Sequence, residues 1–261
     1  MQHLRPIAFV LISACTTLGP MPTTTAVSAI PAGRPGGEAQ LGIVPAYFLS
    51  SSVQKPHGAG TTQLAVVIEP DRWIDAPGLL LGARLFGQAD DTPGEPLLGY
   101  RKKLGDDLAV AGIVYGTSKR STAKLASYHA TRIGGELAID ARAIAIASWL
   151  AMHVQAAFSA TRVSASGTYC VKPDGTGEDC NQTDPSMNTV VDGKLSGVYP
   201  AGTGSLALDV GRRDTGMFHG ARVALMASTG WMPTATSGVQ GDATSFFAIG
   251  LTLTLGLGKS E

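Results

Sequence analysis

"FFAIGLTLTLGLG", residues 246–258, alternates in character along its whole length. Every second residue from Phe247 to Leu257 is large and apolar, and the residues between them are Ala, Gly and Thr. A period of two is typical of a β-strand with one apolar face and one thin polar face. The fold and the function therefore depend on whether such apolar faces point into a protein core or out into lipid.

The composition leaves two classes of protein open. The chain has 261 residues, of which 15% are charged, a formal net charge of zero, 33 glycines and a mean hydropathy of +0.15. Soluble domains usually contain about 25% charged residues. No apolar run reaches the roughly 18 residues of a membrane-spanning helix. No basic stripe points to nucleic acid as a partner. The chain is then either a well-packed soluble protein or a membrane β-barrel, whose strands carry only half of their residues in lipid.

The first residues are typical of an export signal. His3 and Arg5 precede an apolar stretch at 7–14. Two processing sites are open: a lipobox-like sequence at 12–15, which would lead to lipidation of Cys15, and cleavage after Ala29. We expect residues 1–29 to be a signal peptide. Residues 30–76 are rich in Pro, Gly, Ala and Ser, and we expect them to form a flexible lead-in segment.

Cysteine usage agrees with export. Besides Cys15 the chain has only Cys170 and Cys180, which bracket the turn-rich sequence "VKPDGTGED". An oxidised bridge across a short loop is expected in an exported protein and would stabilise it by roughly 2–3 kcal/mol. A metal site is disfavoured, because no His lies near either Cys at a ligand-like spacing. We therefore predict a disulfide between Cys170 and Cys180.

The same alternation recurs along the chain and predicts eight strands. With 246–258, the predicted strands are 79–88, 96–104, 107–116, 127–142, 149–168, 204–212 and 221–231. Short connections such as 104–107 and 145–148 alternate with long polar ones such as 117–127 and 169–203. Sorting of loops by length, with both chain ends on the short side, is typical of up-and-down transmembrane barrels. The alternative is ten strands, with 61–69 and 191–200 added.

The polar faces of these strands carry charges of both signs. An eight-stranded barrel is only wide enough to be filled by its own side chains. We therefore predict that its polar faces point inward and form a salt-bridge network that plugs the lumen. The predicted members are Arg132, Glu136, Asp140, Arg142, Asp209 and Arg222, and Arg84 and Arg101 also lie on polar faces.

Aromatic residues near the strand ends fit the girdles found where a barrel leaves the bilayer. They are Tyr100, Tyr115, Trp149 and Trp231.

Three features together resemble bacterial outer-membrane β-barrel proteins of the small, uncharacterised kind: the export signal, the alternating strands with long outer loops, and the terminal "GLTLTLGLG". The resemblance covers residues 77–258. The resemblance implies an outer-membrane location, contact with outer-membrane lipid and lipopolysaccharide, and insertion by the barrel assembly machinery. It also implies a monomer without a cofactor. One departure is the end of the chain, "LGLGKSE", where many such barrels place an aromatic residue.

No enzyme signature is present: the sequence lacks G-x-S-x-G, H-E-x-x-H, a phosphate-binding loop and a G-x-G-x-x-G after a strand. Some barrels of the resembling kind are lipid-modifying enzymes that use a His and a Ser near the outer rim. His153 and Ser159 share a face but lie six residues apart, which is about 20 Å along a strand. His129, beside Ser127 and Tyr128, is the better candidate. The simpler interpretation is a solvated histidine at the rim.

The acidic stretch "DGTGEDCNQTD" offers carboxylates at Asp174, Glu178, Asp179 and Asp184. Their spacing does not match an EF-hand loop, so a solvated outer loop is the better interpretation and we expect no metal site.

Three functions are compatible with these patterns. The favoured one is a non-enzymatic outer-membrane barrel with a structural, surface-interaction or narrow-pore role. The second is a lipid-modifying barrel enzyme similar to lipid A deacylases. The third is a soluble or lipid-anchored periplasmic barrel that binds an apolar ligand in its lumen.

Overall fold

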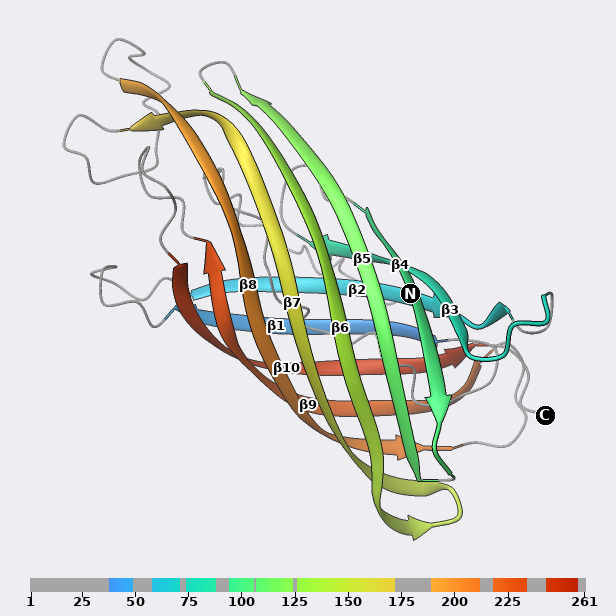
Figure 1. Cartoon of the computed structure of the whole chain (residues 1–261). Helices are drawn as coiled ribbons and strands as arrows, with labels where there is room; N and C mark the ends of the chain where they lie inside the picture. Colours follow the sequence, from blue (N-terminus) through green and yellow to red (C-terminus); the bar gives the residue numbers. More distant parts are fainter. Residues whose placement is uncertain are drawn as a thin grey trace, which may run out of the picture.

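The computed structural model describes residues 38–48, 58–70, 74–87, 94–105, 107–123, 126–171, 189–211, 218–233 and 243–257. Across these residues, antiparallel strands in chain order close an up-and-down barrel (Figure 1). The described strands are β1 (Glu38–Phe48), β2 (Gly58–Ile68), β3 (Leu79–Gly87), β4 (Gly94–Lys103), β5 (Leu108–Ala123), β6 (Ala126–Ala147), β7 (Leu150–Val171), β8 (Thr189–Val210), β9 (Phe218–Pro233) and β10 (Ala243–Leu257). The all-β, antiparallel barrel predicted from the sequence is confirmed. In the described part of the chain the barrel has ten strands, the alternative number, rather than eight.

The added strands lie in the segment predicted to be a flexible lead-in, and that prediction is corrected for 38–48 and 58–68. β2 coincides with the candidate strand at 61–69, whereas β1 was not predicted. The terminal strand pairs with β1, from Glu38 opposite Gly256 to Phe48 opposite Phe246. β1 contains Pro45, and the Pro and Gly residues around it concealed its alternation. In the described part of the chain, the barrel therefore starts at Glu38 and not at residue 77.

Two other predicted boundaries are wrong for a shared reason. Residues 117–127 were predicted to be a long loop, but β5 continues to Ala123 and β6 begins at Ala126. The candidate strand at 191–200 is not separate and continues into 204–210 as β8. In 117–123 both faces are polar, and in 191–197 the polar residues lie on the outer face, so neither segment continues the outward apolar pattern of its strand.

The apolar faces point outward. On β10, Phe247, Ile249, Leu251 and Leu253 are exposed, whereas the small residues between them are buried. We call the exposed apolar side chains of the outer surface the apolar band. It includes Leu64, Val66, Leu85, Leu98, Val114, Ile133, Leu137, Ile139, Val154, Phe158, Val198, Leu206, Leu208, Val223, Leu225, Phe247, Ile249, Leu251 and Leu253. Leu137 on β6 is 69% exposed, while Arg132 on the same strand is fully buried. This distribution is the reverse of that in a soluble protein.

The strands differ greatly in length. β6, β7 and β8 have 22 residues each, whereas β1 to β4 have 9 to 11. β8 and β9 pair only from Ala201 opposite Gly230. Pro200 stands at the parting point, where it has no N–H to donate to β9. A Cβ on Gly230 would lie 2.6 Å from the Pro200 carbonyl oxygen, so only glycine fits there. Beyond this point β5 to β8 extend past the other strands as a sheet (Figure 1).

The two ends of the barrel are distinct. The start of β1 and the end of β10 lie at one end, together with the short connections at 104–107 and 148–149. We call this the terminal end. The opposite end, where the longest connection (172–188) joins β7 to β8, is the loop end. No helix among the described residues has the length and apolar character needed to cross a membrane.

Candidate functional site

The charged side chains of the interior gather in two groups. The first, which we call the arginine cluster, contains Arg84 on β3, Glu95 on β4 and Arg132 and Glu136 on β6. Arg84 and Glu95 are direct partners in the β3–β4 ladder, and Arg84 Nε lies 3.0 Å from Glu95 Oε2. Arg132 Nε lies 3.4 Å from the other oxygen of the same carboxylate. One carboxylate thus joins two guanidinium groups, and all three side chains are fully buried.

Tyr115 on β5 organises the arginine cluster. The guanidinium carbon of Arg84 lies 4.4 Å from the centre of the Tyr115 ring, and that of Arg132 lies 5.1 Å from it. Both cations are therefore placed for cation–π attraction. The Tyr115 hydroxyl and Thr161 Oγ1 on β7 are hydrogen-bonded at 2.7 Å. Gly134, directly opposite Tyr115 in the β5–β6 ladder, leaves room for the ring: a Cβ there would lie 2.5 Å from a ring carbon.

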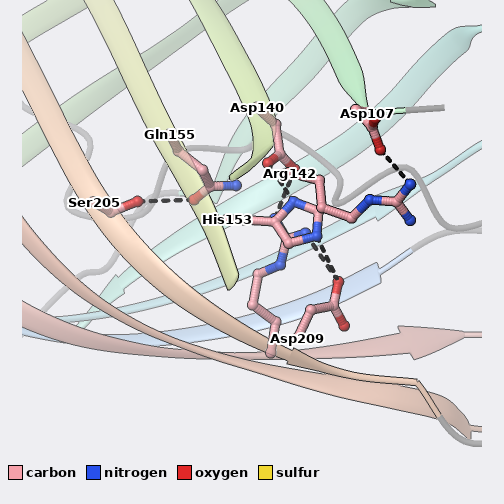
Figure 2. Close-up of polar contacts among 8 residues, drawn as sticks. Asp107, Asp140, Arg142, His153, Gln155, Ser205 and Asp209 are labelled. Carbon is pink, nitrogen blue, oxygen red and sulfur yellow. Dashed lines mark hydrogen bonds and ion pairs between the residues drawn. The ribbon is translucent and has the colours of Figure 1, made fainter. Parts of the chain in front are cut away.

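The second group, the histidine cluster, contains Asp140 on β6, His153 on β7, Asp209 on β8 and Arg222 on β9. Figure 2 labels Asp140, His153 and Asp209. Arg222 donates one hydrogen bond of 2.7 Å to Asp140 and another of 2.9 Å to Asp209. His153 Nδ1 lies 2.9 Å from Asp140 Oδ1, and its Nε2 lies 3.9 Å from Asp209. The strand register explains the grouping, because Asp209 and Arg222 are direct partners across the β8–β9 ladder.

The histidine cluster is less enclosed than the arginine cluster. The side chains of His153 and Asp209 are 15% and 14% exposed, whereas Arg84, Glu95 and Arg132 are at 0%. Next to the cluster, Ser205 donates a hydrogen bond of 2.9 Å to Gln155 (Figure 2). The interior therefore has two charged layers. The arginine cluster is closed to solvent, whereas the hydrogen-bonded histidine cluster is partly reached by solvent.

The sequence-predicted network divides between these clusters, with one exception. Arg132 and Glu136 lie in the arginine cluster, and Asp140, Asp209 and Arg222 lie in the histidine cluster. Arg142 does not: its guanidinium pairs with Asp107 at the terminal end, where its side chain is 39% exposed. Arg142 is opposite His153 in the β6–β7 ladder, but its guanidinium group pairs with the exposed Asp107 and not with the interior carboxylates. Its membership of the interior network is therefore corrected.

Several interior residues were missed or misplaced from the sequence. Glu95 is opposite Arg84 only in the register that β3 and β4 adopt, which the sequence alone does not give. Tyr115 was expected in an interfacial girdle but is buried inside, whereas Tyr100, Trp149 and Trp231 are exposed. Arg101 pairs with Glu69, which follows β2, and both are buried. Alternation along β4 and β5 was the signal that could have placed Glu95 and Tyr115 on the inward face.

The predicted catalytic candidates are placed apart. Ser159 is buried inside, and His153 contacts Asp140 and Asp209 rather than a serine. His129 lies exposed on the outer face of β6, and its Nε2 is 3.0 Å from Ser118 Oγ on β5. The sequence pointed to Ser127 as its neighbour, whereas the ladder brings Ser118 to it.

Other predicted sites fall outside the described residues. These are Cys15 and Cys180, and with Cys180 the predicted disulfide to Cys170, and the acidic residues Asp174, Glu178, Asp179 and Asp184. Within the described ranges, no group of three or more His, Cys, Asp or Glu side chains is arranged to hold a metal ion.

Comparisons with known proteins give structural likenesses only. No family model and no curated protein matches the sequence. Neisserial surface protein A matches over 84% of this chain and 96% of its own, with 9% identity and a TM-score of 0.36. Ail, the attachment invasion locus protein of Yersinia pestis, matches over 85% and 98%, with 9% identity and a TM-score of 0.31. The P. putida toluene transporter TodX matches over 89% and 93%, with 9% identity and a TM-score of 0.29. Because all three scores are below 0.5, the fold rests on the strand pairing of the chain itself.

Proposed function

We propose that the chain is an integral outer-membrane β-barrel protein whose interior is closed by charged side chains. The observation that carries the proposal is the apolar band, which is exposed on the strands around the barrel while Arg84, Glu95 and Arg132 are buried within it. Exposed apolar surface of this extent is unfavourable in water and favourable in hydrocarbon. The third function considered above, a soluble barrel with an apolar lumen, requires the opposite distribution.

The closed interior favours a structural or surface-interaction role over a pore. Two guanidinium groups and two carboxylates fill the lumen at the level of the arginine cluster with no exposure above 2%. Ions would have to separate these paired charges in order to pass. We therefore expect the barrel to be silent in a planar bilayer, and we assign no catalytic step to its interior.

The orientation follows from the ends of the chain. Outer-membrane barrels keep short turns and both termini in the periplasm and long loops outside. On this basis the terminal end faces the periplasm, and the loop end, with the extended sheet of β5 to β8, faces the cell exterior. The extended sheet is then the surface available to partners. Lipopolysaccharide and the barrel assembly machinery are the partners we expect.

Membrane extraction tests this proposal. We expect the mature protein to leave cell envelopes only in detergent and to migrate faster on gels before heating than after, as folded barrels do. A matched measurement in planar bilayers should show no steady conductance. A protein that stays soluble in buffer without detergent would overturn the membrane assignment, and a steady conductance would overturn the closed interior.

A second candidate function rests on the contact between Ser118 and His129. A serine hydroxyl within hydrogen-bond reach of a histidine is the minimal arrangement for nucleophilic attack on an ester, with the histidine accepting the proton. This pair faces outward above the apolar band, where the acyl esters of a membrane lipid would lie. The alternative activity is removal of an acyl chain from such a lipid.

Mass spectrometry of lipid A from cells with and without the protein tests this alternative. Loss of one acyl chain that disappears with Ser118→Ala would support it. Thr229→Ala is the matched control, because Thr229 also carries a hydroxyl group and is exposed on the outer face, on β9, away from Ser118. Unchanged lipid A in the presence of the wild-type protein would exclude the activity.

A further inference from the structure

The outer face of β5 to β8 changes character in ordered rows above the apolar band. Across the four strands, the ladders join Ser118, Thr131, Ser164 and Ser196 as successive partners. We call these residues the hydroxyl row. Partners in an antiparallel ladder lie on one face, so this row places four hydroxyl-bearing residues on the outside. Ser118, Ser164 and Ser196 are exposed and Thr131 is half-buried.

A second row follows two residues closer to the loop end. The ladders join Arg120, His129, Ser166 and Lys194, which we call the basic row. His129, Ser166 and Lys194 are exposed. On the other side of the hydroxyl row, Arg162 lies exposed on β7 between Ile133 and Val198. Successive rows are about 7 Å apart, and four strands span about 14 Å, so these side chains share one compact surface.

The charge of this surface has one sign among the residues whose side chains are described. Arg162 and Lys194 are cations, His129 becomes one on protonation, and the outward positions between them on β5 to β8 hold Ser, Thr, Gly, Ile and Val. In the arginine and histidine clusters, by contrast, charges of both signs are paired inside the barrel.

From this juxtaposition we infer that the hydroxyl row, Arg162, and the described side chains of the basic row (His129, Ser166 and Lys194) bind the phosphorylated sugar headgroup of an outer-leaflet glycolipid. The inference rests on the proposed membrane location, which puts acyl chains against the apolar band and the headgroup directly above it. Cations complement the phosphates, and serine and threonine hydroxyls complement sugar hydroxyls. A phospholipid headgroup offers one phosphate and would leave most of the hydroxyl row without a lipid partner. We therefore commit to lipopolysaccharide as the source.

Native mass spectrometry of the folded protein in neutral detergent tests the inference. The probes are lipid A carrying both phosphates, the same lipid A without phosphates, and phosphatidylglycerol. We expect the phosphorylated lipid A to bind roughly tenfold or more tightly than the dephosphorylated form, because each charge-assisted contact is strong. Phosphatidylglycerol should bind more weakly than phosphorylated lipid A.

The variant Arg162→Ala/Lys194→Ala should lose roughly tenfold in affinity for phosphorylated lipid A, because two charge-assisted contacts are removed. The matched control is Lys102→Ala/Lys103→Ala, which removes two exposed cations from the terminal end and leaves the same net charge. The control should bind as the wild type does. Equal losses in both variants, or equal binding of phosphatidylglycerol and lipid A, would overturn the inference.

The heat-dependent gel shift separates this inference from the proposed function. A detergent-requiring, heat-modifiable barrel with no preference for phosphorylated lipid A overturns only the headgroup site. A protein that needs no detergent overturns both.

Discussion

The arginine cluster and the histidine cluster use the same residue types in different ways. In the arginine cluster, Glu95 joins two arginines at 0% exposure and the Tyr115 ring lies against both cations. In the histidine cluster, Arg222 hydrogen-bonds two aspartates, and one of these and the histidine are reached by solvent. A charged side chain that is buried away from water must be balanced by protein groups, whereas one that water reaches is also stabilised by solvent. Loss of one partner should therefore cost more in the first cluster than in the second.

The largest expected effect is that of Glu95→Gln. The substitution keeps the shape of the side chain but leaves Arg84 and Arg132 without their shared carboxylate. Removal of one partner from a buried ion pair costs about 3–5 kcal/mol. Urea unfolding in detergent micelles, followed by the heat-dependent gel shift, measures this free energy. A variant as stable as the wild type would show that the two guanidinium groups are balanced by other means.

A smaller loss is expected from Gly134→Ala, which acts on the arginine cluster through Tyr115. The new methyl group would lie 2.5 Å from a carbon of the Tyr115 ring, and the ring is in contact with two cations. Overpacking of this kind costs about 1–3 kcal/mol. Gly135→Ala is the matched control, since its nearest atom, at 3.6 Å, is in ordinary contact. Equal unfolding free energies for the two variants would contradict a fixed position of the ring.

Asp209→Asn tests the histidine cluster and should cost less again. The asparagine oxygen can still accept a hydrogen bond from Arg222, and Asp140 continues to balance its charge. Solvent at this site reduces the remaining penalty, so we expect a loss of about 1 kcal/mol. The same urea titration measures it. A loss equal to that of Glu95→Gln would mean that the two clusters are enclosed to the same degree.

The sequence was sufficient for the fold where one face of a strand is apolar and the other polar. β10, β9 and the middle of β6 have this property, and their outward and inward faces follow from alternation alone. The sequence was insufficient to predict β1 and the strand extensions at 117–123 and 189–197. Beyond the apolar band, both faces of β5 are polar, the outer face of β8 is polar, and β1 contains proline. These segments are strands because they hydrogen-bond to a neighbouring strand. A pattern within the segment itself does not reveal that pairing.

The interior clusters were predictable only in part, for a related reason. Alternation assigned Arg132, Glu136, Asp140 and Arg222 to one face. It could not pair them, because pairing depends on the register between strands. Glu95 is a shared partner because β3 and β4 place it opposite Arg84. Ser118 reaches His129 because the β5–β6 register pairs Ser118 with Thr131, two residues from His129 on the same face. Parity also could not show that Arg142, which is opposite the inward His153, pairs with the exposed Asp107 at the terminal end.

Arg142→Ala should have the smallest effect of the four substitutions, although Arg142 belongs to the same sequence pattern as Arg132. Its partner Asp107 is 63% exposed, and the guanidinium itself is 39% exposed. Solvent and salt screen such a pair, so its contribution is at most about 0.5 kcal/mol. The unfolding free energy in micelles should therefore match that of the wild type within error, at low and at high salt. A loss approaching that of Glu95→Gln would place Arg142 back among the interior charges and would mean that the charged interior extends to the terminal end of the barrel.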